Sequence, residues 1–391
     1  MRRLSAHFII TNDGPPLRMG IVTSADDGTI ISVEDTGGSL KESVSVEFYN
    51  GIIIPGFVNC HCHLELSHLK GAIPKTTGLG GFLSELQQIR KSSPEIIVSA
   101  ASEADRAMYD EGIVLCADIC NNASTFSIKK TSRIRYHNLL EVFASDPGLA
   151  ETRTREIIKL SEESEQYSLP FSIVPHTVYT VSLPLFRLLR GIASENKVTS
   201  IHFMETEGEE AFVSEQSGQL MESLRKTGLI SDKLLTPRSC TSAILEEVTL
   251  SGSLILVHNT FVDRQTVSRI NKRGNVYWCL CPNANLYIEN RMPPAEMLAA
   301  EGCDIVTGTD SLASNERLSI LSELKTIQEH CPSISLTDLI SWATINGARA
   351  LGQEDNYGII GPGKKPGLLI LDGIDFKNFK LSAGTFVKRL M

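Results

Sequence analysis

Two histidines one residue apart, His61 and His63, follow a strongly apolar stretch of the chain, residues 52–58. Successive side chains of a β-strand point to opposite faces, so both imidazoles are expected on one face and Cys60 and Cys62 on the other. Two imidazoles side by side at the end of a buried strand provide half of a four-ligand site for a divalent metal. An isolated His-x-His also occurs on ordinary polar strand edges, so the pair needs partners elsewhere in the chain.

The elements that must position this pair are alternating strand-like and helix-like segments in the middle of the chain. The strand candidates are residues 57–63, 113–119, 138–144, 171–177, 200–206, 254–260, 276–282 and 304–310. Amphipathic helical stretches lie between them, at 82–90, 185–195, 220–227, 265–273 and 318–330. Apolar strands that alternate with helices indicate a parallel sheet covered by helices, and eight such units predict a (β/α)8 TIM-type barrel. An open doubly wound sheet is the competing fold, but no GxGxxG follows a strand.

Both ends of the chain consist of short β-like pieces separated by turn signals. In the first fifty residues these pieces are 7–12, 19–24, 29–35 and 44–50, and similar ones follow at 368–373 and 385–388. We therefore expect a small β-sandwich built from both chain ends, residues 1–54 and 358–391. The barrel is expected to occupy residues 55–357.

The composition limits which partners the protein is expected to bind and which cell compartment it is expected to occupy. The formal net charge of −9 gives no basic face, which argues against nucleic-acid binding. No signal peptide and no apolar run of membrane-spanning length occur, so no membrane partner is expected. The nine cysteines are scattered, mostly within apolar runs, and no CxxC occurs, which indicates reduced thiols in a cytoplasmic protein.

Side chains able to bind a metal recur at the ends of the predicted strands. In a TIM-type barrel the chemistry is found at the C-terminal ends of the strands. Five of the nine histidines and one aspartate lie at such ends, which is not a random distribution: His61, His63, His176, His202, His258 and Asp310. A four-thiolate zinc site made by Cys60, Cys62, Cys279 and Cys281 is the alternative, but strand alternation directs the first two away from the histidines.

The order of these motifs resembles the metal-dependent amidohydrolase superfamily, in the branch that holds guanine deaminase, S-adenosylhomocysteine- and adenosine-type deaminases, aminodeoxyfutalosine deaminase and the triazine hydrolases. The resemblance spans nearly the whole chain. The matching segments are PGFVNCHCHLELS (55–67), PHTVYTVS (175–182), HFMETEGE (202–209), LVHNT (256–260), CPNANL (281–286), GTDSLASN (308–315), ATINGARALG (343–352) and GIIGPGKKPGLLIL (358–371).

The resemblance implies a role for each matching residue. His61, His63 and His202 are expected to bind one divalent metal through nitrogen and Asp310 through its carboxylate, with Zn²⁺ as the favoured ion and Fe²⁺ as the alternative. Two-metal members of the superfamily usually carry a modified lysine at the end of the fourth strand, where this chain has His176, so one metal is expected.

The same resemblance implies the catalytic groups. Such a metal activates a water molecule at neutral pH, and His258 and Asp310 are expected to orient it and take its proton. Glu205 is expected to transfer protons to the substrate and to the leaving amine. The alternative for Glu205 is that it is an ordinary solvated acid on a loop. The alternative for His258 is a structural role.

Substrate contacts are expected from His176, Glu65, Ser311 and Asn285, which stand near the predicted metal, although His176 could equally be structural. Arg291 departs from the small residue that relatives often have there. The predicted reaction is hydrolytic deamination of an aminated N-heterocycle, a purine base or purine-nucleoside-like molecule. The alternatives are hydrolysis of a C–Cl or cyclic amide C–N bond, or a catalytically silent ligand-binding barrel. A homo-oligomer is expected only because relatives often form dimers.

Overall fold

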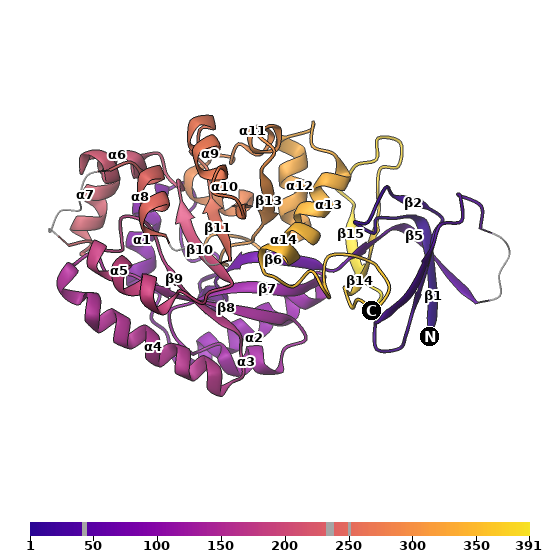
Figure 1. Ribbon diagram of the computed structural model, residues 1–391, viewed down its shortest axis with the longest axis horizontal. Coiled ribbons are helices and arrows are strands. Elements are labelled where there is room, and N and C mark those ends of the chain that lie inside the picture. Colours follow the sequence, from indigo (N-terminus) through magenta and orange to yellow (C-terminus); the bar gives the residue numbers. More distant parts are fainter. Residues whose placement is uncertain (41–44, 232–237, 249–251) are drawn as a thin grey trace.

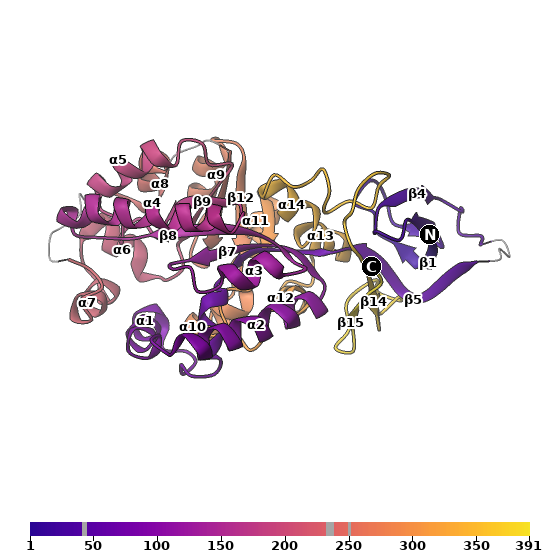
Figure 2. The same cartoon turned by 90° about the horizontal axis from the view of Figure 1, so that it is seen from below.

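The computed structural model describes residues 1–40, 45–231, 238–248 and 252–391. It consists of a large domain of helices and parallel strands and a smaller β-sheet at one end of the molecule (Figure 1). Both chain termini lie at this smaller sheet, and the view from below shows the same separation (Figure 2).

Eight parallel strands form the centre of the large domain, and each of the eight predicted strands is present. They form two four-stranded sheets with the orders β6-β7-β8-β9 and β10-β11-β12-β13. The bounds are β6 (Phe57–Cys62), β7 (Ile113–Cys120), β8 (Arg135–Val142), β9 (Phe171–Pro175), β10 (Val198–Phe203), β11 (Ser253–His258), β12 (Val276–Leu280) and β13 (Asp304–Thr307). The order within each sheet follows the sequence, without the reversal that defines a doubly wound sheet.

The two sheets contact each other at both pairs of edges. The backbone N–H of His202 in β10 donates to the carbonyl of His176, just after β9, with an N···O distance of 3.0 Å. At the other pair of edges, Cys62 at the end of β6 forms a parallel bridge with Asp310, which follows β13. The large domain is therefore a TIM-barrel-type α/β domain, and these contacts bring its strand ends together.

Helices follow the strands and pack against them. The longer ones are α1 (Gly78–Ile89), α2 (Pro94–Asp110), α4 (Ala150–Gln166), α5 (Leu183–Ile192) and α12 (Ile320–His330). The shorter ones are α3 (Phe126–Thr131), α6 (Gly208–Glu215), α7 (Gln219–Lys226), α8 (Cys240–Glu247), α9 (Arg264–Asn271), α10 (Pro282–Glu289), α11 (Ala295–Ala300), α13 (Leu336–Trp342) and α14 (Ile345–Ala350), with the 3-10 turns η1 (Leu64–Leu69) and η2 (Pro147–Leu149).

The five predicted helical stretches correspond to α1, α5, α7, α9 and α12, whereas α2 and α4 had not been predicted. Both of these helices have a narrow buried face. In α4 the buried residues are only Ala150, Ile157, Leu160 and Ser164. A helix that buries so few apolar side chains gives a weak periodic signal in the sequence.

A cluster of buried side chains takes at least one member from each of the eight strands, and we call it the interior cluster. Its strand members include Val58, Cys60, Leu115, Leu139, Val174, Val198, Ile255, Tyr277 and Val306. Cys62 belongs instead to the cluster that packs under the helices. The prediction that Cys60 and Cys62 share one face is therefore wrong. Strict alternation fails because the register of β6 against β7 shifts between Asn59 and Cys62.

The smaller sheet has seven strands in the order β15-β14-β5-β1-β3-β4, with β2 paired to β1. Their bounds are β1 (Arg2–Ile9), β2 (Leu17–Arg18), β3 (Ile21–Ser24), β4 (Ile30–Glu34), β5 (Val46–Pro55), β14 (Leu368–Asp372) and β15 (Phe386–Arg389). Val44, the first residue of one predicted strand, lies outside the described residues. The chain passes from β5 into β6 through Gly56, where an added Cβ would lie 2.3 Å from a methyl group of Val114.

None of the helices in the described part of the chain combines the length and the apolar character that a membrane crossing needs.

Candidate active site

Three of the predicted metal-binding side chains meet at the C-terminal ends of β6 and β13. The Nε2 atoms of His61 and His63 are 3.1 Å apart. Asp310 Oδ1 lies 3.3 Å from His63 Nε2 and 3.5 Å from His61 Nε2. Two ligand atoms at about 2.0–2.1 Å from a tetrahedral zinc ion are about 3.3 Å apart. The three measured distances therefore fit three ligands of one ion.

His202 and His258, from β10 and β11, form a second group of possible ligands that shares His61 with the first. One ligand atom each of His61, His202 and His258 lies within 4.8 Å of the others, as is true of His61, His63 and Asp310. Across the described ranges, no such group contains a cysteine. The donor set is thus imidazole and carboxylate, which suits zinc, and the four-thiolate alternative has no geometric support.

The fold holds Asp310 in place through its backbone and its second oxygen. The backbone N–H groups of Thr309 and Asp310 donate to the His61 carbonyl at 2.9 and 3.1 Å. Ser314 Oγ donates to Asp310 Oδ2 at 2.5 Å, which leaves Oδ1 facing the imidazoles. Asp310 has a φ of 56°, a strained value for a residue other than glycine. Gly308 allows this close approach, because an added Cβ would lie 2.7 Å from the Cβ of His61.

His258 faces Glu205. The His258 Nε2 to Glu205 Oε1 distance is 3.6 Å. Asn285 donates its side-chain N–H to His258 Nδ1 at 3.2 Å, so the proton of the neutral imidazole is on Nε2. The φ of His258 is 77°, again in the left-handed region. This residue is therefore held in one orientation, with its N–H directed at the carboxyl group.

Glu205 is buried, and burial favours the protonated form of its carboxyl group. Burial raises the pKa of Glu205 well above its ordinary value, and the charges of Asp310 and Glu209 raise it further. The turn that carries it is fixed by the Glu209 carboxylate, which accepts the backbone N–H groups of Met204 and Glu205 at 3.0 and 3.1 Å. A carboxyl group with a raised pKa is suited to act as a general acid.

Burial shifts the pKa of the histidines in the opposite direction. Burial lowers the pKa of His63 and of His258 to about 3 and lowers the pKa of His202 well below its ordinary value. Neutral imidazole is the form that binds a metal. The pKa of Asp310 is raised by burial but is lowered more strongly by its contacts with His61, His63 and His258, so the net shift is downward. These shifts favour the neutral form of His63, His202 and His258 and the ionised form of Asp310.

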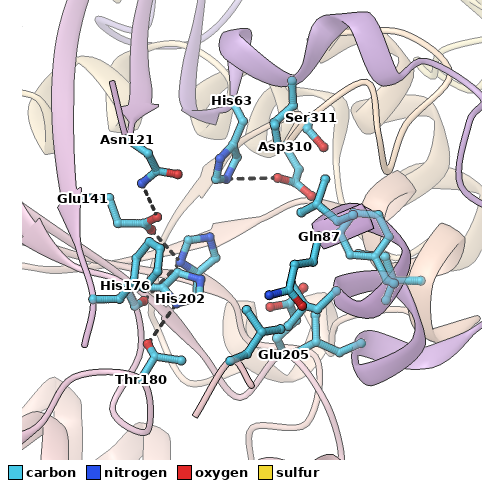
Figure 3. Close-up of a pocket in the computed structure, with 18 of the residues that line it drawn as sticks. His63, Gln87, Asn121, Glu141, His176, Thr180, His202, Glu205, Asp310 and Ser311 are labelled. Atoms are coloured by element: carbon cyan, nitrogen blue, oxygen red, sulfur yellow. Dashed lines mark hydrogen bonds and ion pairs between the residues drawn. The ribbon is translucent and has the colours of Figure 1, made fainter. Parts of the chain in front are cut away.

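These groups open into a cavity of about 130 Å³ (Figure 3). Its polar lining consists of His63, Asn121, Glu141, His176, Thr180, His202, Glu205, His258, Asp310 and Ser311, with Gln87 and Arg90 contributed by the α1 segment. The apolar lining consists of Leu66, Leu79, Phe82, Leu83, Leu86, Phe143, Tyr179, Leu224, Leu229 and Ile288. Such a cavity can take a planar apolar ring and direct its polar edge toward the histidines.

Two of the four predicted substrate-binding residues line the cavity and two do not. Ser311 and His176 line it, and His176 Nδ1 is 2.9 Å from Thr180 Oγ1. Asn285 lies behind His258, to which it donates. Glu65 lies behind the cavity wall, where it accepts the backbone N–H of Asn121 at 3.2 Å. Sequence position near the metal does not reveal whether a buried side chain faces the cavity or supports its wall.

Arg291, the departure from relatives, is exposed and lies beside Phe261. Several cavity residues were missed from the sequence, among them Glu141, Asn121 and Gln87. A signal existed for Glu141, since it is a carboxylate that follows two leucines in strand β8, one residue before the strand ends. Asn121 likewise follows directly after β7.

Comparison with known proteins agrees with this geometry. Residues 52–390 match the amidohydrolase family. Among curated proteins, the chain is 24% identical over 385 residues to the 5'-deoxyadenosine deaminase of Methanothermobacter thermautotrophicus, covering 92% of this chain and 82% of that protein.

Among solved structures, Helicobacter pylori aminofutalosine deaminase in complex with methylthio-coformycin superimposes with a TM-score of 0.79 at 20% identity, over 98% of this chain and 94% of that one. Atrazine chlorohydrolase TrzN from Arthrobacter aurescens TC1, complexed with zinc, gives a TM-score of 0.73 at 18% identity, over 97% and 90% of the two chains. These likenesses support the fold. With the family match over most of its length, the chain belongs to the amidohydrolase family.

Proposed function

We propose that this chain is a metal-dependent deaminase that hydrolyses the exocyclic amine of an N-heterocycle, a purine base or a purine-nucleoside-like molecule. One observation carries the proposal. The carboxyl group of Glu205, whose pKa is raised by burial, faces His258 Nε2 at 3.6 Å, beside the histidines and Asp310. A general acid next to a metal-type donor set is what removal of an amine from a ring requires. The 5'-deoxyadenosine deaminase of Methanothermobacter, similar over most of both chains, supports this reading.

We propose His61, His63, His202 and Asp310 as the ligands of a single zinc ion, with iron(II) as the alternative. The mutual distances of 3.1, 3.3 and 3.5 Å among three of these ligand atoms support it, as does the zinc in the similar TrzN structure. When bound, zinc acts as a Lewis acid that activates water at neutral pH.

The other side chains of the site would transfer protons, orient the water and bind the substrate. Glu205 donates its proton to the ring nitrogen beside the amine-bearing carbon. The attacking water releases two protons, one as it adds to the carbon and one as the carbonyl forms. Glu205 takes up both in turn: it passes one to the amine, which leaves as ammonia, and it keeps the other, which restores its starting state. His258 and Asp310 orient the attacking water, and the net reaction consumes one water for each ammonia released. His176 and Ser311 bind the ring edge, while the apolar residues of α1 cover the ring face and exclude bulk water.

We also propose that the two four-stranded sheets close into one (β/α)8 barrel at residues 55–357. The hydrogen bond from His202 to His176 and the bridge between Cys62 and Asp310 support closure at both seams. Residues 1–54 and 358–391 would form the accompanying β-sandwich. The pairing of β5 with β14, which joins the two chain ends, supports this division.

A second candidate reaction is displacement of chloride from a ring, which the likeness to atrazine chlorohydrolase favours. The same donor set and cavity would serve it, because the loops select the leaving group. The test uses purified zinc-loaded protein and a panel of adenine and guanine bases, their nucleosides, 5'-deoxyadenosine and a chlorinated triazine.

We expect ammonia release, in a one-to-one ratio with product, from at least one aminopurine. Chloride release without ammonia would favour the second reaction. Neither product from a fully zinc-loaded enzyme would contradict both reactions and favour a ligand-binding barrel.

A further inference from the structure

Glu141 is a buried carboxylate that the reaction proposed above does not use. It lies near the end of β8, and its side chain is only 4% exposed. Its Oε2 atom accepts a hydrogen bond from Asn121 Nδ2 at 3.0 Å. Its Oε1 atom is buried without a hydrogen-bond partner and lies 3.5 Å from His202 Nδ1. An unpaired buried carboxylate oxygen is costly, so a nearby dipole or charge has to offset that cost.

The neighbouring group is the ring of His202. Its Nδ1 atom also lies 3.1 Å from the backbone carbonyl of His176, and a carbonyl can only accept. The Nδ1 atom therefore carries the proton, and Nε2 keeps its lone pair. That lone pair is available to the group that His202 forms with His61 and His258. Figure 3 shows Asn121, Glu141 and His202 one after another along one wall of the cavity.

We infer that Glu141 is a positioning residue that sets His202 as a metal ligand. Its negative charge beside the Nδ1–H polarises the imidazole and makes Nε2 a stronger electron donor. Asn121 fixes the carboxylate by binding its other oxygen. This inference rests on the proposed metal site, but it makes a separate claim about which side chain tunes one ligand of that site.

The same three side chains allow a competing interpretation. Glu141, His176 and His202 each place a ligand atom within 4.8 Å of the others, which is close enough for a second cation. That cation would need the lone pair of His202 Nδ1, and this nitrogen already donates its proton to the His176 carbonyl. His176 Nδ1 is likewise engaged with Thr180 at 2.9 Å. A positioning role requires no change in this hydrogen bonding, and we favour it.

Replacing Glu141 by glutamine tests the inference with little change in shape. Both neighbours of the carboxylate, Asn121 Nδ2 and His202 Nδ1, are donors. A glutamine amide has only one accepting oxygen, so its NH₂ group must face one of these donors. Glu141→Gln therefore removes the charge and introduces one donor–donor contact, whereas Glu141→Asp keeps the charge on a shorter side chain. Asp105→Asn is the matched control, since Asp105 accepts hydrogen bonds from Ser132 and Tyr136 away from this cavity.

The measurements are the zinc dissociation constant, by competition with a chromophoric chelator, and the ring-nitrogen NMR signals of ¹⁵N-histidine-labelled zinc-loaded protein. We expect Glu141→Gln to weaken zinc binding about 10–100-fold and to shift the protonated Nδ1 signal of His202. Glu141→Asp should fall between this variant and the wild type, and Asp105→Asn should match the wild type.

Unchanged zinc affinity with an unchanged Nδ1 signal in Glu141→Gln would overturn the inference, as would two zinc ions per chain in the wild type. If that variant does not fold, Asn121→Ala decides the matter. It keeps the carboxylate but releases Oε2, so several-fold weaker zinc binding is expected and equal affinity would overturn the inference. Turnover by the wild type reports separately on the proposed function, because neither measurement here depends on catalysis.

Discussion

The C-terminal ends of the eight strands and the interior packed between the same strands have opposite chemistry. At the C-terminal ends lie buried histidines, Asp310 and Glu205, two of them with backbone φ values in the left-handed region. Deeper along the strands lies the interior cluster, whose members are almost all aliphatic or thiol side chains. Burial raises the pKa of Cys60 and of Cys281 in that cluster well above the ordinary value, which favours the neutral thiol at both positions.

This contrast shows how the fold separates stability from chemistry. The strained and desolvated groups at the strand ends cost free energy, and the close-packed apolar side chains from every strand offset it. Changes at the strand ends should therefore alter activity more than stability, and changes in the interior cluster should do the reverse. The predictions below test this separation.

The largest effect is expected from Glu205→Gln. The amide keeps the shape of the side chain but cannot give up and recover a proton, so kcat/KM should fall about 10²–10⁴-fold. Zinc content and the melting temperature should stay close to those of the wild type. The control is Glu207→Gln, an exposed acid two residues away. If Glu205→Gln lowered the melting temperature as much as a substitution in the interior cluster does, the separation of stability from activity would be contradicted.

Ile255→Ala should show the reverse pattern. Ile255 is fully buried in β11 and belongs to the interior cluster, so the cavity left by truncation should lower the free energy of unfolding by about 2–5 kcal/mol. The folded fraction should retain its kcat/KM. Urea unfolding followed by fluorescence measures the first quantity, and Ile96→Ala, at an exposed position, is the control. Lost activity without lost stability would contradict the assignment.

Ser314→Ala tests how strongly the strand ends depend on supporting hydrogen bonds. Ser314 Oγ donates to Asp310 Oδ2 at 2.5 Å, and its removal frees the carboxylate to rotate away from the imidazoles. We expect zinc binding to weaken about 10-fold, measured by chelator competition. Ser161→Ala, which removes a hydroxyl on the surface of α4, should leave the affinity unchanged. Equal affinity in both variants would show that the fold alone holds Asp310.

Glu323 in α12 should give the smallest effect when the pH changes by a single unit. Burial raises its pKa to about 8, from 4.5 in an unfolded chain, so between these values the folded state holds more protons than the unfolded state. Its contribution to stability is present below pH 4.5 and is lost as the pH rises through 8, by roughly 1 kcal/mol per pH unit. Glu323→Gln should remove this dependence, as measured by urea unfolding at several pH values. If the free energy of unfolding changed with pH equally in the variant and the wild type, this prediction would be contradicted.

The sequence predicted the strands better than the helices that cover them. All eight strands of the large domain could be identified, because each is a short apolar run that ends in a turn or a polar side chain. Helix α4 could not, since most of its surface faces solvent and its few buried residues leave a weak period. The cysteines of β6 were misplaced for a related reason: the sequence contains no sign of the register shift after Asn59.

The site shows the same limit. The sequence was enough to predict that five side chains lie close together: His61, His63, His202, His258 and Asp310. Each of them follows an apolar run, and the C-terminal strand ends of a barrel-type domain lie on one side. The roles of Glu65 and Asn285 depended on side-chain direction. Both are buried near the cavity, but hydrogen bonds to Asn121 and to His258 hold them behind its wall. Glu141 was overlooked because a carboxylate near the end of a strand can face the cavity or the surface, and the sequence does not show which.

The central claim is that side chains from β6, β10 and β13 bind one metal ion. X-ray absorption at the zinc edge on the zinc-loaded protein tests it most directly. We predict one zinc per chain with nitrogen and oxygen ligands at about 2.0–2.2 Å, three of them imidazoles, and loss of the imidazole pattern in His61→Ala/His63→Ala. Zinc–sulfur distances of about 2.3 Å, or an unchanged spectrum in that double variant, would contradict the claim.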